Sequence, residues 1–255
     1  MEHKKAIFQG FSSCSNLILC ELAADLRKLK KDYTFLIIFG LGILYRLINL
    51  SQPIKEDEAM TFLSYVEPLN PFRLFVYTEP NNHVLHTIFV KISTLLFGES
   101  LVSIRIPCFL FSVGIIYLSY AICKRFGQNG IFVAITVSSW PYLIAYSNNA
   151  RGYSLFCFIS LALVYLYLIF RLDFNRTKIF YISIVSALGM LTMPTFVCII
   201  AGIYSWISID QFFLKSIGKN NLLKINFILF TLTSFFTIIL YLPVFLFSPN
   251  GYQAV

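Results

Sequence analysis

The stretch His83–Phe97, whose sequence is HVLHTIFVKISTLLF, decides how the chain is threaded through a membrane. One face carries apolar residues at helical spacing, namely Val84, Leu85, Ile88, Phe89, Ile92, Leu95 and Leu96. The other face carries His86, Thr87, Lys91 and Thr94. A helix of about 15 residues rises only about 22 Å, which is short of the roughly 30 Å hydrocarbon core. The pattern therefore predicts an interfacial helix and not a span.

The rest of the sequence is typical of a polytopic membrane protein. Of its 255 residues 58% are hydrophobic, the mean hydropathy is +0.75, and apolar runs follow one another along the chain. We predict an all-α fold, a transmembrane bundle of about seven spans with a large external first loop (51–100) that carries interfacial helices. The predicted spans are Tyr33–Leu50, Leu101–Cys123, Gly130–Ser147, Tyr153–Phe170, Ile179–Met193, Thr195–Ile209 and Ile225–Leu246. Pro141 is expected to kink the third span, and Pro194 to separate the fifth from the sixth.

Basic residues predict the orientation. The net charge is +8, and a soluble protein with this charge would suggest nucleic acid as a partner. No zinc-finger spacing or arginine-rich tract supports a nucleic-acid partner. If the segment 83–97 lies outside the membrane, eight cations of the later loops become cytoplasmic, as the positive-inside rule requires. They are Lys124, Arg125, Arg171, Arg176, Lys178, Lys215, Lys219 and Lys224. Residues 1–32 then form a cytoplasmic N-terminal segment, with an amphipathic helix over Asn16–Lys31, and residues 33–255 form the transmembrane domain.

Three successive carboxylates, Glu56-Asp57-Glu58, directly follow the first predicted span in a chain with only 13% charged residues. The predicted outer face also collects Glu67, Glu79, His83, His86, Arg105, Asn148, Asn149, Arg151 and Tyr153. Carboxylates can take a proton from an acceptor, and arginines bind phosphate bidentately, so this face suits an anionic lipid headgroup. Arg46, near the outer end of the first span, is expected to snorkel or to pair with the acidic cluster.

The Asp-Glu-Ala sequence at 57–59 resembles the acidic motif of the C superfamily of membrane glycosyltransferases. The group that it resembles is that of the protein O-mannosyltransferases and aminoarabinose transferases (glycosyltransferase family 39). Four further stretches agree in order: EPNNHVLH (79–86), LFGES (96–100), IRIP (104–107) and YSNNARGY (146–153). The resemblance covers Tyr33 to Phe170 and fades afterwards.

This resemblance implies a sugar donor carried on a polyprenyl phosphate and an inverting transfer at the outer face to a lipid, glycan or protein acceptor. Asp57 would be the catalytic base, and Glu58 the second acid, which pairs with Arg105. Arg105 and Arg151 are the candidates for binding the donor phosphate. The candidates for binding the substrate are Asn82, His83, His86 and Tyr153. We expect an integral protein of a bacterial plasma membrane with a cytoplasmic N-terminus and no required cofactor.

Other interpretations of the same residues stay open. Asp57 and Glu58 also fit a solvated acidic loop, and Arg105 and Arg151 also fit interfacial anchors. His83 and His86 with Glu79 would make a weak divalent-metal site, as in a membrane hydrolase. The alternative to an enzyme is a non-catalytic or truncated polytopic protein that serves transport or assembly. Truncation is expected because related enzymes are longer, and the chain also departs from them at Asn82-His83, where they usually have consecutive prolines.

Overall fold

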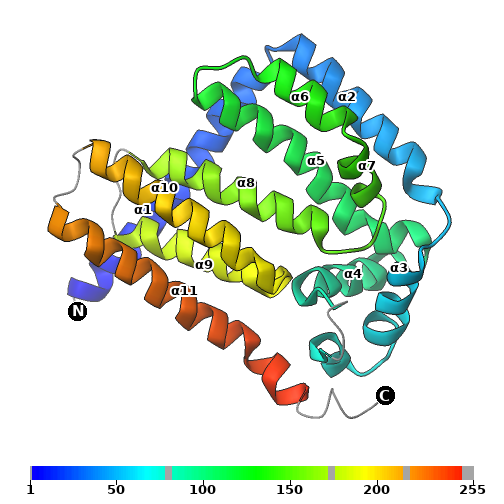
Figure 1. Cartoon of the computed structure of the whole chain (residues 1–255). Coiled ribbons are helices and arrows are strands. Elements are labelled where there is room, and N and C mark those ends of the chain that lie inside the picture. Colours follow the sequence, from blue (N-terminus) through cyan, green and yellow to red (C-terminus); the bar gives the residue numbers. More distant parts are fainter. Residues whose placement is uncertain (1, 78–81, 172–175, 215–218, 249–255) are drawn as a thin grey trace.

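Helices alone build the part of the chain that the computed structural model describes, residues 2–77, 82–171, 176–214 and 219–248 (Figure 1). The all-α prediction is therefore confirmed. Five helical segments in these residues are long and apolar enough to cross a membrane. Three are α2 with its 3-10 extension (Tyr33–Ser51), α5 (Leu101–Arg125) and α8 (Tyr153–Phe170). The fourth is Pro194–Phe213, which joins the 3-10 turn η4 (Pro194–Phe196) to α10 (Val197–Leu214), and the fifth is Lys224–Phe247 of α11 (Lys219–Phe247). The bent pair α6 and α7 makes a sixth if it is counted as one span.

The other elements are shorter or less apolar. They are α1 (Glu2–Leu29), α3 (Glu56–Thr61), the π-helical turn η2 (Phe62–Val66), the 3-10 turn η3 (Pro71–Phe75), α4 (Val84–Phe97) and α9 (Arg176–Thr192). The predicted span Ile179–Met193 falls on α9, which is not among the span-length apolar helices, so a count of seven remains a prediction.

The long helices pack as a row in the order α2, α6, α5, α8, α9 and α11 (Figure 1). Helix α10 (Val197–Leu214) packs against α8 and α11 (Lys219–Phe247). Both predicted proline breaks are present. The axes of α6 (Gly130–Ser139) and α7 (Pro141–Ser147) differ by 61° at Pro141, and a 3-10 turn at Pro194 separates α9 from α10.

The turn at Pro194 packs tightly because its Phe196 ring is fully buried against Gly189 of α9. A Cβ at Gly189 would overlap that ring, so the close return of the chain requires glycine there. Phe196 belongs to the largest buried apolar cluster, which also contains Leu163, Tyr167 and Ile182. This cluster fixes the half of the row that α8, α9 and α10 form.

Arg46 neither snorkels nor pairs with the acidic cluster, so that expectation was wrong. Its side chain is fully buried, and its Nε donates to Ser112 Oγ at 2.7 Å. Its Nη1 donates to the carbonyls of Gly42 and Ser138, and its Nη2 to that of Val137, each at 3.1 Å. Pro141 has no N–H for the carbonyl of Val137, so the break in the helix leaves an acceptor that the guanidinium uses.

Helix α4 lies on α5 and α9 with its polar face turned into the protein. His86, Thr87, Ser93 and Thr94 are buried, whereas the apolar side chains of its last turns, Ile92, Leu95, Leu96 and Phe97, are exposed. The predicted division into two faces is present only in these last turns, because Val84 is buried and Leu85, Ile88 and Phe89 pack against buried apolar clusters. Such a helix can turn its apolar face to lipid while its polar residues bind other protein segments.

We expect Arg46→Met to destabilise the protein by about 2–5 kcal/mol, because it leaves buried carbonyls at the end of α6 without donors. Thermal unfolding in detergent micelles would measure this, with Arg27→Met, which removes an exposed cation of α1, as the control. Equal midpoints for the two variants would contradict the capping role of Arg46.

Candidate active site

Glu58 and Arg105 form a fully buried ion pair at the end of the helix row where α2 stops and α5 starts. Arg105 Nη2 lies 2.6 Å from Glu58 Oε2, and Nε lies 2.8 Å from Oε1, which is a bidentate pair. The backbone N–H of Ala150 donates to Oε1 at 2.8 Å, and that of Lys55 donates to Oε2 at 3.3 Å. Both carboxylate oxygens of Glu58 are therefore occupied from within the protein.

Arg105 uses all five of its N–H groups. Nε and one N–H of Nη2 donate to Glu58. The two N–H groups of Nη1 donate to the carbonyls of Leu50 and Gln52 at 2.7 and 2.6 Å, and the second N–H of Nη2 donates to that of Pro53 at 3.2 Å. The chain that leaves α2 is thus bound to the first turns of α5. The structure places Arg105, a sequence candidate for the donor phosphate, where it has no N–H left for an external anion.

Asp57 lies next to Glu58 on α3 but faces outward, because successive residues of a helix point about 100° apart. Its side chain is 70% exposed, and its Oδ2 lies 3.2 Å from Nη1 of Arg151, which is 7% exposed. Arg151 follows Ala150 in the loop between α7 and α8. The same loop therefore contacts both acids, Glu58 through a backbone N–H and Asp57 through a guanidinium.

Several buried polar atoms around Arg151 have no hydrogen-bond partner among the described residues. They are Nε and Nη1 of Arg151, Oδ1 of Asn148, Oδ1 of Asn149, Nε2 of His83, and both ring nitrogens of His86. Nη1 of Arg151 faces Asp57 as an ion-pair partner without the geometry of a hydrogen bond. More than 90% of buried polar groups in folded proteins are paired, so such a cluster indicates a site that a polar ligand or water fills.

The two histidines of this cluster are neutral near pH 7. Burial, with the nearby charge of Arg151 as a second cause, lowers the pKa of His83 to about 4. Burial and the neighbouring His83 and Arg151 lower the pKa of His86 to about 3. A neutral imidazole has one donor and one acceptor nitrogen, so each ring can exchange hydrogen bonds with a hydroxyl group.

Tyr153 and Gly152 hold His83 against the loop. The rings of His83 and Tyr153 meet edge to face with centroids 5.5 Å apart, and the Arg151 guanidinium lies 5.7 Å from the centre of the Tyr153 ring. A Cβ on Gly152 would lie 2.8 Å from Cβ of His83, so only glycine permits this approach. Tyr153, half-buried, is thus brought together with His83 and Arg151.

Asn82 has a different place from the other candidates. Its Nδ2 donates to the carbonyls of Leu74 and Val76 at 3.0 and 2.8 Å, and its Oδ1 accepts from Thr87 Oγ1 at 2.8 Å. The side chain joins η3 to the start of α4 and is 2% exposed. It therefore shapes the backbone around the cluster and does not face its unpaired atoms.

The metal hypothesis depended on Glu79, which lies outside the described residues. Within the described part of the chain, no three His, Cys, Asp or Glu side chains gather closely enough to hold a metal ion. Sequence reasoning missed the backbone partners of the ion pair, the carbonyls of Leu50, Gln52 and Pro53 and the N–H of Ala150. Every residue supplies such groups, so no residue type marks them in a sequence.

An apolar groove of about 760 Å³ runs along α2, α6 and α7 and ends beside this site. Ile38, Leu41 and Leu44 line it from α2, and Ile135 and Ile144 line it from the bent pair. At one end it reaches Gln52, whose carbonyl accepts from Arg105, and Asn148, which lies three residues before Arg151. A long apolar chain could lie in the groove with its polar end at the charged cluster.

The fold and this site define an integral membrane protein with charged and polar groups gathered at one end of its apolar helices. The family model described as dolichyl-phosphate-mannose-protein mannosyltransferase matches residues 81–247, more than half of the chain. The chain therefore belongs to this family, and it is a membrane glycosyltransferase-like protein of the C superfamily. No curated protein and no solved structure matches the chain.

The matched region contains Arg105 and Arg151 but begins after Asp57 and Glu58. The two ion pairs join the acidic segment to the matched region, since each acid binds one of these arginines. The acidic cluster is therefore in direct contact with the family region.

We expect Glu58→Gln to destabilise the protein by about 3–5 kcal/mol, because it leaves the Arg105 charge buried without its carboxylate. Thermal unfolding in micelles would measure the loss, with the exposed Glu67→Gln as the matched control. Adding Arg105→Met to Glu58→Gln should cost less than the sum of the two single changes. An unfolding midpoint of Glu58→Gln equal to that of Glu67→Gln would contradict this role of the ion pair.

Proposed function

We propose that the protein transfers a sugar from a polyprenyl-phosphate donor to a lipid, glycan or protein acceptor at the outer face of a bacterial plasma membrane. The N-terminus lies in the cytoplasm, and the charged site lies on the opposite side. The observation that carries this proposal is the Asp57–Arg151 pair beside unpaired buried polar groups. Membership of the mannosyltransferase family supports the lipid-linked donor.

Asp57 acts as the base. Its carboxylate is exposed at the mouth of the site, so the hydroxyl group of an incoming acceptor can reach it. The acceptor oxygen attacks the anomeric carbon and gives its proton to Asp57, while the bond between that carbon and the phosphate oxygen breaks. The polyprenyl phosphate leaves with the bonding electron pair, and attack from the opposite side inverts the anomeric centre.

Arg151 binds the donor phosphate. It is nearly buried and has N–H groups without hydrogen-bond partners in the described part of the chain. Charge building up on the leaving phosphate is stabilised by a cation that is already in place. The apolar groove along α2 takes the prenyl chain, which would place the phosphate near Asn148.

His83, His86 and Tyr153 contact the sugar, together with the amide oxygens of Asn148 and Asn149. Neutral imidazoles and amides suit sugar hydroxyl groups, which donate and accept hydrogen bonds at once. Glu58, Arg105 and Asn82 are positioning residues in this proposal, since their polar atoms bind α3, α5 and the loops. No metal is needed for any of these steps.

Asp57→Asn should lower the rate of transfer by about 100- to 10,000-fold, because an amide cannot accept the acceptor's proton. The measurement is release of polyprenyl phosphate from polyprenyl-phosphate mannose by the full chain in membranes supplied with lipid and peptide acceptors. Glu56→Gln removes the neighbouring exposed carboxylate and should keep the wild-type rate. Full activity of Asp57→Asn would exclude it as the base.

Arg151→Gln should weaken binding of polyprenyl phosphate about 10- to 100-fold, and Arg151→Lys should weaken it less, because one charge-assisted contact survives. Titration of the purified protein in micelles would measure the affinities. Arg73→Gln, an exposed cation of η3, is the control. Wild-type affinity in Arg151→Gln would place the phosphate elsewhere.

A further inference from the structure

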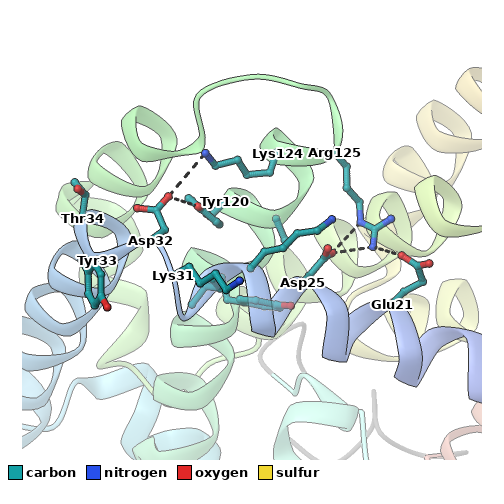
Figure 2. Close-up of a pocket in the computed structure, with 13 residues that line it drawn as sticks. Glu21, Asp25, Lys31, Asp32, Tyr33, Thr34, Tyr120, Lys124 and Arg125 are labelled. Atoms are coloured by element: carbon teal, nitrogen blue, oxygen red, sulfur yellow. Dashed lines mark hydrogen bonds and ion pairs between the residues drawn. The ribbon is translucent and has the colours of Figure 1, made fainter.

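A second polar cavity, of about 670 Å³, lies at the opposite end of the spanning helices (Figure 2). Helix α5 runs from Arg105 at the candidate active site to Arg125 at this cavity. Helix α2 begins here with Tyr33 and ends near the site. The cavity is therefore on the far membrane face, where α1, the 30–32 connection, α2 and α5 meet.

The carboxylates of this cavity already have partners. Arg125 donates to Asp25 through Nε at 3.0 Å and through Nη2 at 2.8 Å, and Nη2 also lies 2.8 Å from Glu21. Asp32 accepts from the hydroxyl group of Tyr120 at 2.5 Å, and Lys124 lies 3.8 Å from the same oxygen. Figure 2 shows these two groups, with Lys31 between them in the view.

The cations are in excess. Lys28, Lys31, Lys124 and Arg125 line the cavity against three carboxylates, Glu21, Asp25 and Asp32. Among the described residues, no carboxylate lies within ion-pair distance of Lys28 or Lys31. Arg125 and Lys124 pair with the three acids, so Lys28 and Lys31 are left without ion-pair partners in the described part of the chain, and the lining has a net charge of +1. The cavity is therefore suited to an anion and not to a cation.

The position of the cavity indicates which kind of anion it meets. It lies where α2 starts and α5 ends, so it opens at the level of the membrane surface. The Tyr33 ring at its edge is 76% exposed, and Leu26 of α1 is 48% exposed, as expected for side chains at an interface. A phospholipid would reach the lysines with its phosphate while its acyl chains stayed among the helices.

We propose that this cavity binds the headgroup of an anionic phospholipid from the leaflet opposite the active site, with its phosphate between Lys28 and Lys31. The bound lipid joins α1 to α2 and α5, beside the Arg125 and Asp32 contacts that already connect them. This role is independent of sugar transfer. The site differs from general attraction of a basic segment to an anionic surface, because only two of the four cations at 27–31 line the cavity.

That difference provides a matched control. The full chain is purified in detergent micelles, which have no anionic surface of their own. It is titrated with phosphatidylglycerol or phosphatidylcholine, and native mass spectrometry counts the bound lipid. K28Q/K31Q should lower the affinity for phosphatidylglycerol at least about tenfold, since each lysine contributes about fivefold. R27Q/K30Q removes the same charge from the same segment outside the cavity and should change the affinity less than about threefold.

Three results would overturn the proposal. An equal loss of affinity in both double variants would mean general surface attraction. Equal binding of phosphatidylcholine and phosphatidylglycerol would mean that the anionic charge of the lipid does not contribute to binding. Inorganic phosphate that competes with the lipid at millimolar concentration would mean a site for a soluble phosphate. A circular dichroism spectrum of K28Q/K31Q like that of the wild type would show that any loss is local.

Discussion

The buried ion pair of Glu58 and Arg105 is the constraint on which the active-site end of the molecule depends. Removing two charges from water costs several kcal/mol for each ion, and only a complete set of hydrogen bonds offsets that cost. The protein meets this condition with main-chain groups from three separate segments: carbonyls after α2, the N–H before α3, and the N–H of Ala150. The pair therefore sets the relative positions of these segments, and with them the place of Arg151.

Arg46 is also a buried charge that hydrogen bonds stabilise, but its described partners include no carboxylate. Within the described residues its charge is shared among the Ser112 hydroxyl and three carbonyls, two of them at the break before Pro141. A broken helix exposes carbonyls that an intact helix would use, so the bend creates the acceptors that make a buried guanidinium tolerable. The bend in turn shapes the apolar groove that ends beside the site.

Local features of the sequence predicted the all-helical fold and its two proline breaks. Long apolar runs, Pro141 and Pro194 act through hydropathy and a missing N–H, which need no knowledge of distant residues. The resemblance indicated which acid pairs with Arg105, and the structure has that pair. Folding alone brings close the main-chain groups on which the place of Arg46, the bonds of Asn82 and the inward polar face of α4 depend. No pattern of side chains in the sequence predicts these contacts.

Asp57 and Glu58 show how one helical step can separate two chemically similar groups. Four donors point at the Glu58 carboxylate, so none of its lone pairs is directed at solvent. Asp57, one residue earlier, faces out toward a cation that is itself short of hydrogen bonds. A base needs an oxygen that the acceptor can reach, whereas a structural anchor needs oxygens that are buried and fully hydrogen-bonded. The division of roles between the two acids thus follows from the direction in which α3 presents each of them, and the Arg105 contacts hold that direction.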